Sequence, residues 1–132
     1  DLVWEAMKDM IGGEIYVKKI PSMKVIDIAK TIAPDCKHNF VGIRPGEKLH
    51  EQMIGLEDAP YTYEYKNYYK ILPQINDWDK DKKRIKSGKK VNDDFFYSSN
   101  TNNKWMTNKE LEKWVENNFN ISDQEVENIL KN

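Results

Sequence analysis

The sequence contains few residues that could form disulfides or bind metal ions. Its 132 residues include one cysteine, Cys36, and two histidines, His38 and His50. A single cysteine excludes an internal disulfide and fits a reducing compartment. We therefore expect a cytoplasmic protein in which Cys36 is a small buried apolar residue. The two histidines have no convincing set of partner ligands around them, so no metal site is predicted.

Net charge and long apolar runs are also scarce. Acidic and basic residues nearly cancel, leaving a formal net charge of −1 at pH 7, which gives no electrostatic reason to expect nucleic acid or an anionic membrane as a partner. No apolar run approaches the roughly 20 residues of a membrane span, and the first residues lack the pattern of a signal peptide. The length corresponds to about one domain with its own core.

Signatures of a self-sufficient redox enzyme are missing as well. No Gly-x-Gly-x-x-Gly run follows a predicted strand, so a dinucleotide site is not visible. No tyrosine is followed four residues later by a lysine, a spacing that many dehydrogenases use for proton transfer. The chain also starts directly in a predicted helix without an initiator Met. We expect a piece of a longer chain, with no catalytic residues of its own.

Helical and extended patterns alternate along the first half of the chain. Ser22 is expected to cap the second helix, and Pro34 to end it. The expected helices cover residues 2–10, 22–33 and 47–54, and the expected strands cover residues 14–20 and 39–43. This order predicts an α/β fold with a small mixed sheet and packed helices.

Residues 42–51 are the most informative stretch. β-favouring residues predict a strand that ends at Arg44, and Pro45-Gly46 predicts a turn. A helix is expected to begin at Glu47. Arg44 would then lie beside a helix N-terminus, where its guanidinium and free N–H groups suit a phosphate or carboxylate. The alternative is that Arg44 pairs with Glu47 or Glu51 and only pins the turn.

The second half of the chain contains an aromatic segment and a basic one. Tyr61, Tyr63 and Tyr65 alternate at period two, which favours a half-buried strand over a surface that stacks bases. Residues 77–90 include seven lysines and arginines and are interpreted as a solvated surface loop, with phosphate contact as the alternative.

A polar loop follows the aromatic residues 95–97. Six small hydrogen-bonding residues lead to Lys104 and Trp105, a composition that suits holding a polar ligand while Trp105 anchors the loop to the core. A turn chosen for backbone reasons alone is the other interpretation. Two capping boxes then predict helices near the C-terminus, Thr107 with Glu110 and Ser122 with Glu125.

Three segments carry a family resemblance. The string GIRPGEKLHE at residues 42–51 closely resembles a signature of inverting UDP-N-acetylglucosamine 4,6-dehydratases, which are extended short-chain dehydrogenase/reductase proteins. Residues 12–15 together with 19–24 are similar to a second family segment, and residues 97–105 to a third. The segments keep the family's order across nearly the whole chain.

The resemblance implies that this chain is the C-terminal, substrate-binding part of such a lyase. Residues 1–117 would form the substrate-binding domain and residues 118–132 a helical tail. In the family, a Rossmann half that is absent here binds NADP and carries the catalytic Asp, Lys and Tyr, so this part alone would bind no cofactor and would be inactive. Family enzymes begin pseudaminic acid biosynthesis by removing water from UDP-N-acetylglucosamine and inverting C5, and the resemblance also implies a homo-oligomer.

The residue pattern and the resemblance agree on one site. Arg44 is expected to contact the pyrophosphate of UDP-N-acetylglucosamine, and Glu47 to accept a ribose hydroxyl or to orient Arg44. The resemblance adds four substrate-side loop residues, Asn102, Asn103, Lys104 and Trp105. Two other functions remain open: a related nucleotide-sugar epimerase or retaining dehydratase of capsule polysaccharide biosynthesis, and a stand-alone non-catalytic binding module.

Overall fold

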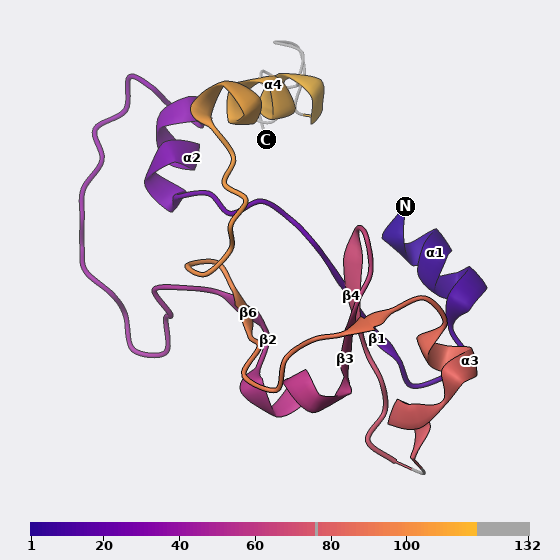
Figure 1. The fold of residues 1–132 in the computed structure, drawn as a ribbon. Helices are drawn as coiled ribbons and strands as arrows, with labels where there is room; N and C mark the ends of the chain where they lie inside the picture. Colours follow the sequence, from indigo (N-terminus) through magenta and orange to yellow (C-terminus); the bar gives the residue numbers. More distant parts are fainter. Residues whose placement is uncertain (76, 119–132) are drawn as a thin grey trace, which may run out of the picture. The chain divides into compact units, whose positions relative to one another are not determined.

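A computed structural model describes residues 1–75 and 77–118, whose backbone forms helices, short 3-10 turns and strands (Figure 1). The α-helices are α1 (Leu2–Asp9), α2 (Val25–Ile32), α3 (Lys82–Ile85) and α4 (Asn108–Asn118). The 3-10 helices are η1 (Leu56–Tyr61) and η2 (Trp78–Lys80). The strands are β1 (Ile15–Lys18), β2 (Gln52–Ile54), β3 (Thr62–Glu64), β4 (Tyr68–Ile71), β5 (Lys89–Lys90) and β6 (Tyr97–Ser98).

These elements belong to two compact units. The first unit contains residues 1–20 and 43–103, and the second contains residues 21–42 with the described residues from Lys104 onward. The expected combination of a small sheet with helices is confirmed, but every strand ladder in the described part is antiparallel, so the sheet is not mixed. The domain boundary at residue 117 stays a prediction, and the tail with the second capping box lies outside the described residues.

The first unit is built around a four-stranded sheet in the order β1-β4-β3-β5. β4 pairs on both sides, so that Ile71 lies opposite Ile15 of β1 and Thr62 of β3. Because side chains alternate along a strand, Tyr69 and Ile71 share one face of β4 and Lys70 lies on the other. The hydrophobic core forms on the face of Tyr69, from Val17, Ile54, Tyr69, Ile71 and Tyr97.

The opposite face of β4 carries a fully buried lysine. The Lys70 ammonium donates to Asp9 Oδ2 at 2.6 Å and to the carbonyl oxygen of Arg84 at 2.5 Å. It also lies 5.7 Å from the ring centroid of Tyr16 and 5.0 Å from that of Tyr65. A buried charge is costly unless it is paired and hydrogen-bonded. Lys70 therefore connects the end of α1 and the turn of α3 to the sheet.

Arg84 makes a second buried ion pair in the same unit. Its Nη1 donates to Glu14 Oε1 at 2.6 Å and to the carbonyl oxygen of Gly12 at 2.7 Å. The guanidinium carbon lies 4.2 Å from the ring centroid of Trp78. The interpretation of residues 77–90 as a solvated loop is therefore wrong at this position, because the short helix α3 turns Arg84 inward.

The second unit consists of α2 packed against α4, with an extended pairing beside them. The Ser22 N–H donates to the carbonyl oxygen of Lys104 at 2.8 Å, and the Met106 N–H donates to that of Ser22 at 2.9 Å. The predicted capping box at the start of α4 is confirmed. The Thr107 N–H donates to Glu110 Oε2 at 2.8 Å, and the Glu110 N–H donates to Thr107 Oγ1 at 3.3 Å.

Four local expectations are wrong. Residues 39–43 form no strand, although their residue types favour one. Residues 47–54 are not helical, because their last three residues pair with β6 instead. α2 begins after Lys24 instead of being capped by Ser22, whose backbone is engaged in the extended pairing. Cys36 is exposed and not buried.

One other expectation holds. β3 and β4 confirm a half-buried strand structure in the tyrosine-rich segment, where Thr62, Tyr69 and Lys70 are buried. None of the described helices has the length and apolar character needed to cross a membrane.

Candidate functional site

The Pro45-Gly46 turn is present and has a defined geometry. The Glu47 N–H donates to the carbonyl oxygen of Arg44 at 3.1 Å, which closes a four-residue turn. Gly46 has φ +86°, a conformation that side chains other than glycine rarely adopt, and Pro45 presets the preceding φ. The turn therefore fixes the backbone on both sides of it.

Arg44 and Glu47 also interact through the Glu47 side chain. Glu47 Oε2 accepts from the Arg44 N–H at 2.8 Å, and Glu47 Oε1 lies 3.8 Å from Arg44 Nε. The Arg44 side chain is 78% exposed. The pairing that pins the turn is thus observed, and it fits Glu47 as the group that orients Arg44. The expected helix N-terminus beside Arg44 is absent, because the next element is the strand β2.

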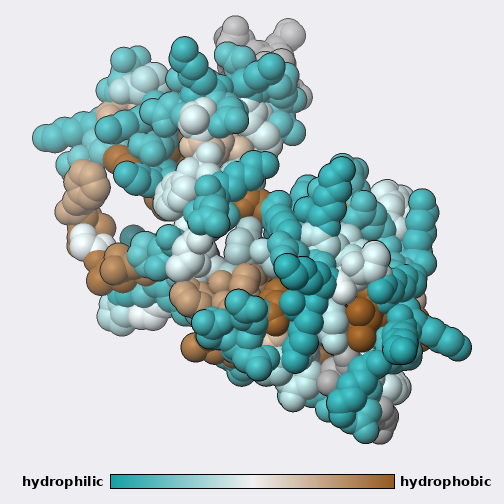
Figure 2. Space-filling model, viewed as in Figure 1, coloured by the Kyte–Doolittle hydropathy of each residue, from teal (hydrophilic) through white to brown (hydrophobic). Residues whose placement is uncertain are grey.

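The loop around this turn is open to solvent. Residues 39–53 are all exposed, including the apolar side chains of Phe40, Val41 and Leu49, which are 81–86% exposed. Figure 2 shows brown, apolar surface along this loop at the left of the view, where Figure 1 draws the long connection between α2 and β2. Such a loop can approach a ligand without first breaking core contacts.

A short ladder links the segment after the turn to the start of the polar loop. Gln52 of β2 lies opposite Ser98 of β6, and Ile54 lies opposite Tyr97. Beyond the ladder, the Ser99 N–H donates to the carbonyl oxygen of Glu51 at 2.8 Å. Two of the segments singled out in the sequence, residues 42–51 and the start of residues 97–105, therefore meet in the first unit.

Tyr97 fixes the backbone that holds the polar loop. Its buried hydroxyl accepts from the Ile20 N–H at 3.0 Å and donates to the Ile20 carbonyl oxygen at 2.9 Å. Asn102 Nδ2 donates to the same carbonyl oxygen at 2.7 Å. The side chain of Asn102 is thus held by the peptide group that Tyr97 fixes. Sequence reasoning missed this role of Tyr97, and only its place at the end of an aromatic run hinted at it.

The other predicted loop residues are distributed over both units. Asn103 is exposed and belongs to the first unit, whereas Lys104 and Trp105 belong to the second. Trp105 is 46% exposed, so the expectation that it anchors the loop to the core is wrong. Its backbone pairs instead with Ser22 in a parallel bridge.

The predicted site residues include charged and hydrogen-bonding side chains. Its charged groups are Arg44 and Glu47, and its amides come from Asn102 and Asn103. Within residues 1–75 and 77–118, no group of three or more His, Cys, Asp and Glu side chains is arranged to hold a metal ion. The arrangement suits recognition of an anionic, hydrogen-bonding ligand.

Comparison with known families gives one match that covers more than half of the chain. The family described as Polysaccharide biosynthesis protein matches residues 1–73. This range contains the Arg44 turn and the strands from β1 to β4.

Known enzymes that act on nucleotide sugars are similar to the chain. The UDP-N-acetylglucosamine 4,6-dehydratase (inverting) of Campylobacter jejuni serotype O:2 is 50% identical over a match covering 77% of this chain and 32% of that protein. The enzyme of the same name from serotype O:23/36 is 47% identical with the same coverage. The UDP-glucose 4-epimerase of Rickettsia massiliae is 30% identical over 69% of this chain and 28% of that protein. The chain spans about a third of the length of these relatives.

A solved structure shares the fold. The X-ray structure of Pen from Bacillus thuringiensis aligns with a TM-score of 0.69 over 89% of this chain and 34% of that chain. The two sequences are 23% identical, so this likeness concerns the backbone arrangement alone.

Proposed function

The chain belongs to the polysaccharide biosynthesis protein family, and from this membership we propose that it is the UDP-sugar-binding portion of an inverting UDP-N-acetylglucosamine 4,6-dehydratase. The similarity to the two Campylobacter jejuni enzymes supports this specific activity. Because the chain spans about a third of their length, the chemical step is assigned to a part of the enzyme outside these residues.

The exposed guanidinium of Arg44 is the observation that carries the proposal. Glu47 holds its backbone and approaches its Nε, while in the described part of the chain the two terminal nitrogens of Arg44 have no acceptor. A planar guanidinium with both terminal nitrogens available can bind two phosphate oxygens at once. We assign Arg44 to the pyrophosphate of the UDP-sugar and Glu47 to the orientation of Arg44.

Four further residues are proposed as substrate-side residues. In the first unit, Asn102 and Asn103 would offer amides to the ligand; in the second unit, Lys104 would offer a charge and Trp105 an aromatic surface. Binding energy from the UDP end, which does not react, orients the sugar for reaction elsewhere in the enzyme. Assembly into a homo-oligomer stays a prediction.

The described residues do not fit a dinucleotide cofactor. Gly12 and Gly13 follow the helix α1 and lead into the strand β1, which is the reverse of the strand-to-helix turn that binds a pyrophosphate. NADP would take up a hydride from the sugar and later return it in the dehydratase reaction. We propose that it is bound outside this chain, and none of the residues here is assigned to it.

One observation supports a second candidate. The 30% identity with the UDP-glucose 4-epimerase of Rickettsia massiliae fits an epimerase that acts on a UDP-sugar. The same contact between Arg44 and the diphosphate would serve either enzyme, because both substrates share the UDP group.

Titration of UDP into the protein tests the assignment of Arg44. The Arg44→Ala substitution is expected to weaken UDP binding about 10- to 100-fold, since a charge-assisted hydrogen bond contributes about 1.5–3 kcal/mol. The free energy of unfolding should change by less than about 1 kcal/mol, because exposed ion pairs contribute little to stability. Calorimetry measures the first quantity and urea unfolding the second.

Lys48→Ala is the matched control. Lys48 is an exposed cation next to the same turn, so its removal should change UDP affinity only slightly. Arg44→Lys should recover part of the affinity, because it keeps the charge but not the planar fork. Equal UDP affinity of the Arg44→Ala variant and the unchanged protein would refute the assignment.

A further inference from the structure

Helix α1 has apolar side chains on two sides, and only one side is used within the described residues. Leu2 and Ala6 are partly buried and lie on the same side of the helix as Asp9. Asp9 anchors this inner side, because its Oδ2 accepts from the Tyr16 hydroxyl at 2.8 Å and from Lys70 Nζ at 2.6 Å. The inner side therefore fixes α1 to the sheet of the first unit.

A second apolar stripe, formed by Val3, Trp4 and Met7, runs along the outer side of α1. Val3 and Met7 lie four positions apart, so they are neighbours on the helix surface, and Trp4 lies next to them. All three residues are 61–69% exposed. Outside the inner side, the polar residues of α1 are Glu5 and Lys8. A surface helix usually buries its apolar stripe and exposes its polar side, so the outer stripe of α1 is an uncovered apolar surface.

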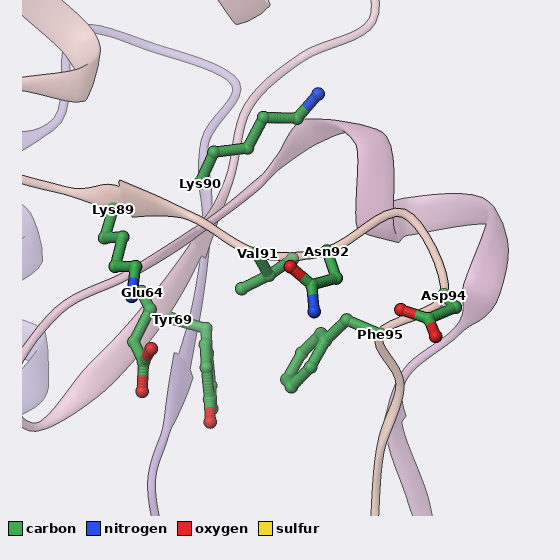
Figure 3. Close-up of a pocket in the computed structure, with 8 residues that line it drawn as sticks. All are labelled: Glu64, Tyr69, Lys89, Lys90, Val91, Asn92, Asp94 and Phe95. Atoms are coloured by element: carbon green, nitrogen blue, oxygen red, sulfur yellow. The ribbon is translucent and has the colours of Figure 1, made fainter.

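The sheet of the first unit does not use the outer stripe for its own core. On the core face of β4, the ring centroid of Tyr69 lies 5.1 Å from that of Phe95 and 5.3 Å from that of Tyr97. Figure 3 shows Tyr69 and Phe95 of this core, with a small hollow beside them. The other face of β4 carries the ion pair between Lys70 and Asp9. A cover for the outer stripe would therefore come from outside the described residues.

We propose that the outer stripe of α1 docks onto an apolar surface of the part of the enzyme that carries out the chemical step. This inference rests on the proposed function, in which the chain binds the UDP-sugar and spans about a third of the length of its relatives. The bound sugar must be held in a fixed geometry, because a misplacement of about 1 Å can lower the rate about 100-fold. Domains move relative to one another unless a large apolar interface holds them. A second copy of this chain would bring another binding part and no reacting groups, so it would not meet this need.

Oxidation of methionine by hydrogen peroxide, read residue by residue with mass spectrometry, tests this inference. The rate at Met7 is compared between this chain alone and the full-length enzyme that contains it, with free methionine as the internal standard. Met7 should be oxidised about fivefold more slowly, or slower still, in the full-length enzyme, because oxidation follows exposure. Equal rates in the two proteins would overturn the inference. Protection that disappears when the full-length enzyme is diluted to monomers would assign the stripe to a second copy and would also overturn it.

Met7→Lys in the full-length enzyme gives a second readout. A charge in the apolar contact should lower the rate of water removal about tenfold and leave UDP affinity, which we assign to Arg44, unchanged. In this chain alone the urea midpoint should not change, because Met7 is exposed. Lys8→Gln, on the polar side of α1, is the matched control and should keep the full rate.

An unchanged rate in the Met7→Lys enzyme, or an equal loss in both variants, would overturn the inference. Failure of the docking inference can be distinguished from failure of the proposed function, because UDP binding is measured separately. Intact UDP binding with an unprotected Met7 would concern docking alone, whereas absent UDP binding would refute the proposed function.

Discussion

The side chain of Lys70 holds three elements of the first unit together, namely β4, α1 and α3. Its ammonium is fully buried between the carboxylate of Asp9 and the carbonyl oxygen of Arg84. Nothing in the tyrosine-rich sequence around it distinguishes Lys70 from the exposed Lys66. The difference arises from strand alternation and from the arrival of α1 and α3 on that face of β4.

Substitution of Lys70 by methionine is expected to lower the free energy of unfolding by about 3 kcal/mol. The aliphatic stem would remain packed, but Asp9 would lose one of its cations in a largely buried place, and breaking a buried pair is strongly destabilising. Urea unfolding followed by far-ultraviolet circular dichroism measures the change. Lys66→Met at the exposed end of the same hairpin should stay within about 0.5 kcal/mol. Equal stability of the two variants would contradict the role of Lys70.

Asp9 makes stability depend on pH. Burial raises the pKa of its carboxyl, but hydrogen bonds from Lys70, Lys86 and Tyr16 outweigh burial and lower the pKa from 3.8 to about 2. Because the folded pKa is the lower one, the contribution of Asp9 is fully present above pH 3.8 and is lost as the pH falls through about 2. The shift corresponds to about 2 kcal/mol.

We therefore expect the unchanged protein to lose about 2 kcal/mol more stability between pH 5 and pH 2 than the Asp9→Asn variant. Unfolding in urea at several pH values measures this difference. Parallel pH profiles for the two proteins would show that Asp9 does not contribute in this way.

At the scale of single elements, the turn after Arg44 depends on the positive φ of Gly46. Gly46 has φ +86° with no atom close to the position of a Cβ, so a side chain would fit in space but strain the backbone. Gly46→Ala is expected to cost about 1 kcal/mol at the turn and to weaken UDP binding by displacing Arg44. Gly46→Asn should be tolerated better, because asparagine adopts positive φ more readily. UDP titration of both variants checks this order, and an alanine variant that binds UDP as well as the asparagine variant would contradict it.

Helix α4 depends on its capping box. Thr107→Ala removes the hydroxyl that accepts from the Glu110 N–H and should destabilise the helix by about 1 kcal/mol. Amide hydrogen exchange in the first turn of α4 should become faster. Lys109→Ala, on the same turn but outside the box, should leave the exchange rates nearly unchanged. Faster exchange in both variants alike would point to a general loss of packing instead.

The wrong element predictions share a physical cause. Residues 39–43 have the composition of a strand, but a strand needs a neighbour for its N–H and C=O groups, and these residues have none in the described part. Residues 52–54 follow an apolar spacing that suits a helix, yet β6 offers them a ladder. The capping box at Thr107 was predicted correctly because its two partners lie three residues apart.

At the scale of the whole molecule, the proposal that this chain binds the substrate while the chemical step takes place elsewhere in the enzyme can be tested. This chain alone, incubated with UDP-N-acetylglucosamine and NADP, is expected to leave the mass of the sugar nucleotide unchanged, because no catalytic constellation is present in its described part. A protein of this family with the full length of the relatives should remove one water. A product of unchanged mass but altered configuration would favour the epimerase candidate instead.

The sequence alone predicted the features that depend on residues only a few positions apart in the chain. Residues 42–51 predicted the Pro45-Gly46 turn and the family, and they offered the Arg44–Glu47 pair as one alternative, since each depends on neighbours along the chain. The tertiary structure decided which partners distant segments found. Only it placed Tyr97 on the Ile20 peptide, buried Lys70 and Arg84, and packed Tyr69 against Phe95. Those contacts join residues far apart in the sequence, where composition and periodicity carry no information about the partner.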